Sequence, residues 1–334
     1  PFSARMKVNH TKQREQIFEE VWRKLDTNFY DPNFHGQDWQ QLHDHYKPWA
    51  LQTSSDRDFE DVVNMMLGEL NASHMGFSTS DRAETQDVET GLLGTEVTPV
   101  SNGVEVQRVV PNSPADREVS TLNPGDVITS VGGEAVSEVD NFYSLLTDRV
   151  DTPTMLRVEN EDGESREMVI EPTGDLGNEL YNQWVERRKE LVDEYSDGQL
   201  GYIHVEGMNW PSFERFEREL VATGEDKKGI VIDVRYNGGG WTTDYLLTVL
   251  QYKQHAYTIP RGATNNLQQN KTKFRDHYPY GERLPLSSWT ENAITLANQN
   301  SYSTAEIFSH AFKNLDLGTL VGEPTFGAVI STGG

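Results

Sequence analysis

A serine in a strand-to-helix turn is the first feature of this sequence that could carry chemistry. Ser303 lies between an apolar run at 293–297, typical of a strand, and a helix predicted over 304–313. A serine in such a turn projects its hydroxyl at the carboxyl edge of a sheet. The helix N-terminus beside it supplies unpaired N–H groups for a developing oxyanion. Serine is also favoured at helix N-caps for structural reasons alone, so nucleophile and N-cap are both open.

A run of three glycines at 238–240 is the second feature. It follows a continuous apolar strand predicted over 229–234. Glycine lets a backbone approach a ligand closely, so the loop could offer N–H donors to an anion. No Lys-Ser/Thr pair follows, and the G-x-G-x-x-G spacing is absent. An oxyanion hole therefore fits as well as a phosphate loop, and a plain tight turn is the structural alternative.

One histidine stands apart from the other eight. His74 is directly preceded by Ser73 and followed by apolar residues, which predicts partial burial. An imidazole in such a place can take a proton from a serine, although a single histidine is more often structural. His43 and His45 flank an aspartate, but side chains two positions apart on a helix diverge, so we predict no metal site. The absence of cysteine excludes thiolate metal ligands and a cysteine nucleophile.

A short glycine-flanked loop opens a region rich in predicted strands. The strands are expected at 96–100, 104–110, 126–131, 155–159 and 167–171, with one helix over 139–146. Successive N–H groups in such a loop form a nest for a carboxylate, and the strand edge that follows can accept an extended peptide. The candidate peptide-binding residues are Gly91, Leu92, Leu93 and Gly94.

The elements around these motifs indicate several domains. Helical periodicity covers 11–70, with helices expected from Thr11, over 38–46 and from Ser55, and a charged helix is expected at 178–195. From residue 200, strands alternate with helices, which indicates an α/β layout with a mostly parallel sheet. The polar stretch 257–289 is predicted to be a functional surface loop.

Composition narrows the classes of protein. A length of 334 residues is too great for one core, so two or three units are expected. With 53 acidic against 29 basic residues the net charge is −24, which argues against nucleic acid or an anionic membrane as partner. No stretch of about 18 apolar residues exists that could span a membrane.

In this order, the motifs resemble those of the serine peptidases of the C-terminal processing (tail-specific) and tricorn type. The region 91–173 resembles a PDZ domain. Three further segments match the family's D-[LV]-R-x-N-x-G-G stretch, its nucleophile segment and the segment after it, at 233–240, 300–307 and 322–327. The nucleophile of that segment lies three residues before a glutamate, which is the position of Ser303.

The resemblance implies a multidomain α/β fold. It divides the chain into an N-terminal helical domain, a PDZ-like β domain, a linking helix and a ClpP/crotonase-like α/β peptidase core, at 1–79, 91–173, 174–198 and 199–334. Because the chain opens at Pro1 and stops soon after a predicted strand, we expect a fragment whose core is truncated at the C-terminus. Tricorn-like relatives often carry a β-propeller ahead of this region, and we expect one in the longer protein.

The family activates its serine in two ways. In the processing branch a Lys follows the last glycine of the final segment, where this chain has Ala328; in the tricorn branch the base is a His directly after a Ser. The tricorn pattern implies a nucleophile, a base with its orienting hydroxyl, and oxyanion donors, namely Ser303, His74, Ser73, Thr304 and Gly239 or Gly240. A fourth, acidic residue is expected beyond residue 334.

We therefore expect a serine endopeptidase or C-terminal-processing-like hydrolase that cleaves peptides or protein tails. It would need no cofactor and no metal, would bind peptide or unfolded protein, and could form a homo-oligomer; relatives favour export to the periplasm over the cytoplasm. Three alternatives stay open: an inactive PDZ-bearing peptide-binding relative, a Ser-Lys peptidase whose Lys is replaced by Ala328, and a crotonase-like enzyme without a serine nucleophile.

Overall fold

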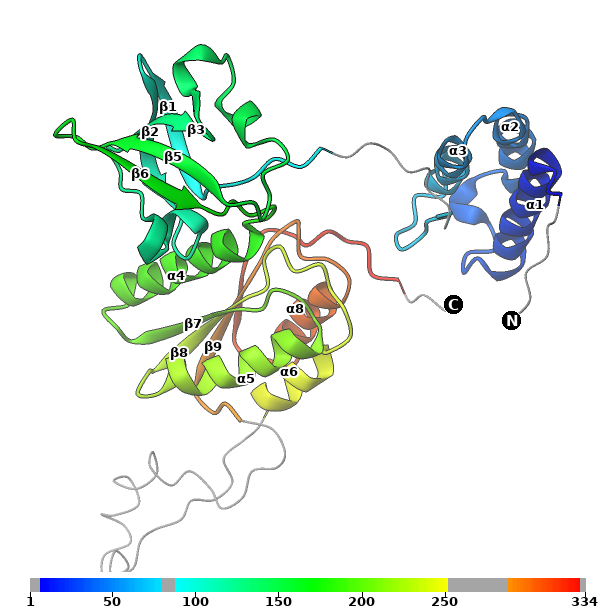
Figure 1. The fold of residues 1–334 in the computed structure, drawn as a ribbon. Helices are drawn as coiled ribbons and strands as arrows, with labels where there is room; N and C mark the ends of the chain where they lie inside the picture. Colours follow the sequence, from blue (N-terminus) through cyan, green and yellow to red (C-terminus); the bar gives the residue numbers. More distant parts are fainter. Residues whose placement is uncertain (1–6, 80–87, 252–287, 331–334) are drawn as a thin grey trace, which may run out of the picture. The chain divides into compact units, whose positions relative to one another are not determined.

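The structure is a computed structural model that describes residues 7–79, 88–251 and 288–330 (Figure 1). The chain divides into two units: Pro1–Thr85 with Phe326–Gly334 form one, and Gln86–Thr325 form the other. We call them the helical unit and the sheet unit. In the described residues, no helix is both long enough and apolar enough to cross a membrane. Most of the predicted loop at 257–289 lies outside the described residues, but Trp289 is described and is buried.

Three α-helices form the helical unit: α1 (His10–Asn28), α2 (Trp39–Gln52) and α3 (Asp56–Gly68). Each begins at a side-chain cap, from Asn9, Asp38 and Ser55 respectively. The helix expected from Ser55 begins there with a capping box, whereas the helix expected from Thr11 begins at His10, because Asn9 accepts the Lys12 N–H and caps it. The apolar faces meet in one core, whose largest buried members include Phe18, Trp39, Tyr46, Phe59, Met66 and Leu70.

The second helix is longer than expected. Its predicted end was Tyr46, but α2 continues through Pro48 to Gln52. Proline removes one backbone donor and normally ends a helix. Here Tyr46 and Ala50 are both buried in the core of the helical unit, so packing on either side of Pro48 holds the helix together.

The sheet unit contains an antiparallel sheet of six strands. Its order is β1 (Thr95–Val100), β2 (Gly103–Val109), β3 (Val127–Val131), β5 (Thr154–Glu159) and β6 (Ser165–Ile170), and β4 (Glu134–Ala135) pairs with β3. The five strands expected from the sequence are confirmed. The helix expected over 139–146 is wrong: only a short 3-10 turn, Phe142–Leu146, forms. The Leu146 carbonyl accepts the Gly91 N–H, so it closes onto the neighbouring loop instead of continuing a helix.

A parallel sheet of four strands forms the rest of the sheet unit. Its order is β10 (Thr319–Gly322), β9 (Asn292–Ala297), β8 (Gly229–Asp233) and β7 (Leu200–His204), which confirms the predicted parallel layout. Helix α4 (Gly177–Tyr195) covers one face, and α5 (Trp210–Gly224), α6 (Thr243–Leu250) and α8 (Thr304–Asn314) cover the other (Figure 1). Alternate residues of β8 face the two layers, which is why its sequence is continuously apolar: Val231 packs toward α4, and Ile230 and Ile232 pack into the larger core.

Candidate functional site

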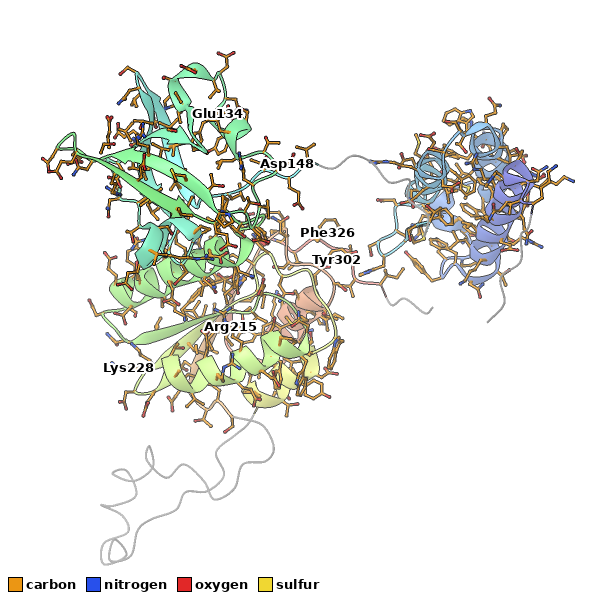
Figure 2. All side chains as sticks on the ribbon, viewed as in Figure 1. Glu134, Asp148, Arg215, Lys228, Tyr302 and Phe326 are labelled. Atoms are coloured by element: carbon orange, nitrogen blue, oxygen red, sulfur yellow. The ribbon has the colours of Figure 1, made fainter. Side chains whose placement is uncertain are left out.

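The turns that follow β8 and β9 meet at the carboxyl edge of the parallel sheet. The Tyr302 N–H (Tyr302 is labelled in Figure 2) donates to the Asn237 carbonyl at 2.9 Å. The Ser301 hydroxyl donates to the Val234 carbonyl at 2.8 Å and is completely buried. These two bonds hold the glycine loop against the turn that carries Ser303. The structure therefore brings together two of the motifs that the sequence analysis singled out.

Ser303 has an unusual backbone conformation, with φ 56° and ψ −121°. Residues at N-caps normally lie in the β region, and a positive φ is uncommon for any residue other than glycine. A strained strand-to-helix turn of this kind is where nucleophilic serines of hydrolases are found. Ser303 is also the N-cap of α8, in a capping box with Glu306, so its conformation adds a feature typical of a nucleophile to that structural role.

A buried carboxylate supports this turn. Glu306, only 6% exposed, accepts the Ser303 N–H on Oε2 at 2.9 Å. Its other oxygen, Oε1, accepts the Thr325 hydroxyl at 2.9 Å. Glu306 thus connects the start of α8 to the segment that follows β10. Sequence reasoning used Glu306 only to locate the serine and missed its positioning role.

Gly239 lies directly against Ser303. Its φ is +89°, and a Cβ at this position would lie 2.7 Å from Ser303 Cβ and 3.0 Å from the Thr304 nitrogen. Only glycine fits such an approach. The contact places the glycine loop beside the backbone N–H of Thr304, as an oxyanion hole requires.

The structure narrows the predicted oxyanion donors. Gly239 and Gly240 were alternatives, and the Gly239 N–H already donates to the Asn237 side-chain oxygen at 2.8 Å. Among the described residues, the N–H groups of Gly240 and Thr304 have no hydrogen-bond acceptor. Asn237 is fully buried, and its Nδ2 donates to the Val205 carbonyl at 2.8 Å, so it is fixed in place. Its position inside the matched motif was the one signal that could have indicated this role.

A buried ion pair fixes the strand end before the glycine loop. The carboxylate of Asp233, fully buried, accepts from Arg235 Nε at 2.9 Å, from Arg235 Nη2 at 2.5 Å and from the Tyr202 hydroxyl at 2.7 Å. The hydrogen bonds from Arg235 to Asp233 raise the pKa of the guanidinium above its usual value. Burial raises the pKa of the Tyr202 hydroxyl, so the phenol stays protonated and donates.

His204, at the end of β7, belongs to the same support. Its Nε2 donates to the Arg235 carbonyl at 2.9 Å, and the Tyr181 hydroxyl donates to its Nδ1 at 2.8 Å. Burial lowers the pKa of this imidazole. A neutral ring with one donor and one acceptor nitrogen satisfies both bonds. No residue pattern around His204 predicts this role.

His74 lies in the helical unit, in a turn with Ser73 that follows α3, and its φ is 57°. Ser73, Met75 and Phe77 are half-buried, whereas His74 and Gly76 are exposed. The expected partial burial of His74 is therefore wrong, because its left-handed turn conformation leaves the ring exposed. The Ser73 hydroxyl donates to the Ala328 carbonyl at 2.5 Å, so its single proton does not go to the His74 ring. His74 belongs to the helical unit and Ser303 to the sheet unit.

Two of the four backbone N–H groups in the predicted carboxylate loop, 91–94, already donate hydrogen bonds within the PDZ-like domain. The N–H groups of Gly91 and Leu92 donate to the carbonyls of Leu146 and Thr173, at 2.8 and 2.7 Å. The N–H groups of Leu93 and Gly94 have no acceptor among the described residues. Only these last two are placed to bind a carboxylate. No group of three or more His, Cys, Asp or Glu side chains in the described ranges could hold a metal ion.

Three protein-family models match successive parts of the chain. They are peptidase family S41 at residues 199–333, the tricorn protease C1 domain at 10–68 and the PDZ domain at 91–167. Residues 199–333 therefore match peptidase family S41, behind a tricorn-type helical region and a PDZ domain. These matches confirm the resemblance drawn from the motifs, to a tricorn-like S41 peptidase with a PDZ domain.

The relatives support the same assignment. Tricorn protease homolog 1 of Streptomyces coelicolor is 29% identical to this chain over 337 residues. The match covers 98% of this chain and 30% of the relative. The tricorn protease of Thermoplasma acidophilum is 25% identical and covers 94% and 28% respectively. The chain thus spans less than a third of the length of these relatives.

A crystal structure of the tricorn protease has the same fold. It matches this chain with a TM-score of 0.78 at 24% identity, and the match covers 97% of this chain and 31% of the chain in that structure. The expected fold class, with helices, a PDZ-like domain and an α/β core, is therefore confirmed.

Proposed function

We propose that this chain carries the catalytic serine and the general base of a tricorn-like serine peptidase acting on peptides or protein tails. The observation that carries the proposal is the backbone of Ser303, at φ 56° and ψ −121°, with Gly239 packed against it. A strained serine beside unpaired backbone donors is what acyl transfer needs and what an N-cap does not.

The reaction follows from the roles of the groups. Ser303 Oγ attacks the peptide carbonyl while His74 takes the hydroxyl proton, and His74 then returns that proton to the departing amine. The acyl-serine is hydrolysed when water attacks it by the same route. The N–H groups of Thr304 and Gly240 hold the oxyanion, and one such donor is worth about 3 kcal/mol of transition-state stabilisation.

Activity would depend on both units because the nucleophile and the base lie on different ones. The chain passes from the sheet unit to the helical unit between Thr325 and Phe326. Thr325 is bonded to Glu306 within the first, and Ala328 to Ser73 within the second. Only Phe326 and Gly327 separate these two anchors in the sequence.

The PDZ-like domain would capture substrate. Among the strands that the structure describes, β1 pairs with β2 alone, so its other edge would accept an extended peptide. The open N–H groups of Leu93 and Gly94 precede this strand and would receive the terminal carboxylate of the peptide.

A fluorophosphonate probe, which reacts with activated serines, tests the proposal. We expect labelling of the chain and of the longer protein, lost in Ser303→Ala and reduced at least about 100-fold in His74→Ala, because general base catalysis contributes factors of that order. Ser101→Ala, an exposed serine in the β1–β2 turn, is the matched control and should label normally. Absence of any Ser303-dependent label in either protein would overturn the proposal, and a label that survives His74→Ala would remove His74 as the base.

A further inference from the structure

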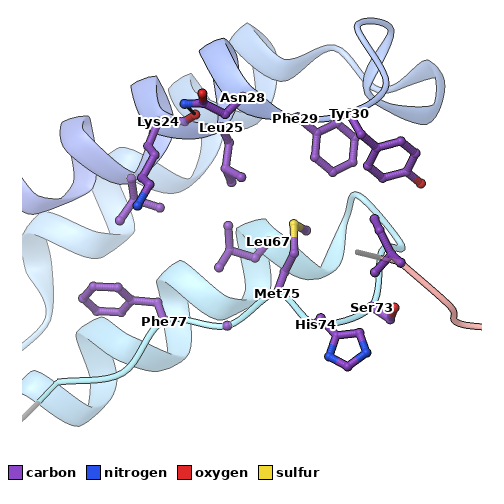
Figure 3. A pocket seen from close by; sticks show the side chains of 13 residues that line it. Lys24, Leu25, Asn28, Phe29, Tyr30, Leu67, Ser73, His74, Met75 and Phe77 are labelled. Carbon is purple, nitrogen blue, oxygen red and sulfur yellow. Dashed lines mark hydrogen bonds between the residues drawn. The ribbon is translucent and has the colours of Figure 1, made fainter. Parts of the chain in front are cut away.

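A cavity of about 440 Å³ opens in the helical unit, between α1 and the segment 73–77, which contains His74 (Figure 3). All the residues that line it belong to this unit. Ligand sites commonly have volumes of about 300–1,000 Å³ and mostly apolar walls with a few polar groups. Neither the proposed nucleophile nor the PDZ-like domain accounts for this cavity.

The walls of the cavity are apolar and come from three parts of the unit. The principal apolar members are Leu25, Phe29, Leu67, Met75, Phe77 and Ile330. Figure 3 shows Met75 pointing from its segment toward Leu67, whereas the His74 ring points away from the helices. Phe77 is fixed by two hydrogen bonds with the Asn64 side chain, at 2.7 and 2.8 Å. The floor of the cavity is therefore part of the packed unit and is present without a ligand.

Most polar groups of the lining already have partners. Asn28 Nδ2 donates to the Lys24 carbonyl at 2.7 Å, the Tyr30 hydroxyl bonds His35 Nε2, and Ser73 donates to Ala328. Lys24 differs, because its ammonium has no ion pair or hydrogen bond with any residue in the described ranges. It is the one Lys or Arg in the lining, in a chain whose net charge is −24.

An apolar cavity with a single unpaired cation at its wall fits a ligand that has an apolar body and one carboxylate. We propose that this cavity binds the C-terminal residue of a peptide, with an apolar side chain between α1 and the His74 segment and the free carboxylate paired with Lys24. The choice of a peptide rests on the proposed function, since the segment that carries the proposed base forms one wall.

Binding is tested in the Ser303→Ala variant of the full chain, in which the proposed cleavage cannot consume the ligand. The probes are N-acetyl-Ala-Ala-Leu as free acid and as C-terminal amide, titrated by calorimetry. We expect the acid to bind about tenfold more tightly than the amide, because one charge-assisted hydrogen bond is worth a factor of that order. Lys24→Gln should remove this difference. Lys12→Gln is the control: it removes the same charge from the same helix, at an exposed position that does not line the cavity.

The PDZ-like domain could bind the same peptide, so the readout is the change in the acid-to-amide affinity ratio when Lys24 is replaced. No change in this ratio in Lys24→Gln, or an equal change in Lys12→Gln, would overturn the proposal. So would tight, Lys24-dependent binding of octanoate without binding of the peptide, since this assigns the cavity to a fatty acid. The result is separate from the test of catalysis. Peptide binding without a labelled Ser303 leaves this site standing, and a labelled Ser303 without Lys24-dependent binding removes it alone.

Discussion

Ser73 Oγ donates a 2.5 Å hydrogen bond to the carbonyl oxygen of Ala328, across 255 positions of the chain. Residue 328 is the position at which the processing branch of the family is expected to carry its Lys base. The bond places that position beside the Ser73-His74 segment, within one unit. The position at which the resemblance would place a Lys base therefore adjoins the segment of His74, the base that we propose.

Removing this bond should loosen the His74 segment. We expect Ser73→Ala to lower the rate of fluorophosphonate labelling about tenfold, because misplacing a catalytic group reduces the rate steeply. Ser73→Thr keeps the hydroxyl and should retain most of the rate. The labelling rates of the two variants, measured beside wild type, check this. Equal rates in Ser73→Ala and wild type would show that the bond has no positioning role.

Two adjacent glycines provide a sharp test of the oxyanion loop. In Gly239→Ala the added Cβ would lie 2.7 Å from Ser303 Cβ at a φ of +89°, whereas at Gly238 there is nothing within 4 Å. We expect Gly239→Ala to abolish labelling and to lower the free energy of unfolding by more than about 2 kcal/mol. Gly238→Ala should leave both nearly unchanged. Labelling and thermal unfolding of the two variants measure the contrast, and similar behaviour of both would contradict the geometry.

The buried carboxylate of Glu306 should matter to stability more than an average side chain. Glu306→Ala leaves the Ser303 N–H and the Thr325 hydroxyl without their acceptor, and each buried unpaired group costs about 1–3 kcal/mol. We expect a total loss of about 2–4 kcal/mol by chemical denaturation. Thr325→Val removes one of the two bonds and should cost about 1 kcal/mol. A loss in Glu306→Ala no larger than in Thr325→Val would mean that the Ser303 bond contributes little.

The sequence predicted the elements well where periodicity decides them. The β8 run and the strands of the PDZ-like sheet follow from apolar patterning, which depends on local burial. The motifs also predicted that the turn of Ser303 meets the glycine loop. Between 139 and 146, however, the outcome depended on a long-range bond, from Gly91 to the Leu146 carbonyl, that no local pattern contains.

Errors in the predicted site have the same origin. Whether a given N–H is open depends on its neighbours in space, and Gly239 loses its donor to the side chain of Asn237. The exposure of His74 depends on a turn in which this non-glycine residue has a φ of 57°, and no residue pattern around Ser73-His74 predicts that conformation. The residue types of the candidate site could be predicted from the sequence, but their hydrogen bonds could not.

The buried side chain of His204, which bonds the loop that follows β8, should make the stability of the protein depend on pH. Burial lowers the pKa of His204 in the folded state, so between that value and about 6.5, the ordinary pKa of an unfolded histidine, the unfolded state binds more protons. Stability is then fully present above about pH 6.5 and is lost as pH falls, with a slope of up to about 1.4 kcal/mol per pH unit.

The substitution that isolates this effect is His204→Gln. Glutamine stays neutral and can still donate to the Arg235 carbonyl and accept from the Tyr181 hydroxyl, so the fold should survive while the pH dependence below 6.5 becomes shallower. The matched control is His310→Gln, at an exposed position of α8. Denaturant unfolding of the three proteins at pH 5.0 and 7.5 measures the difference. If the free energy of unfolding of His204→Gln depends on pH as strongly as that of wild type, protonation of His204 does not cause the effect and other groups do.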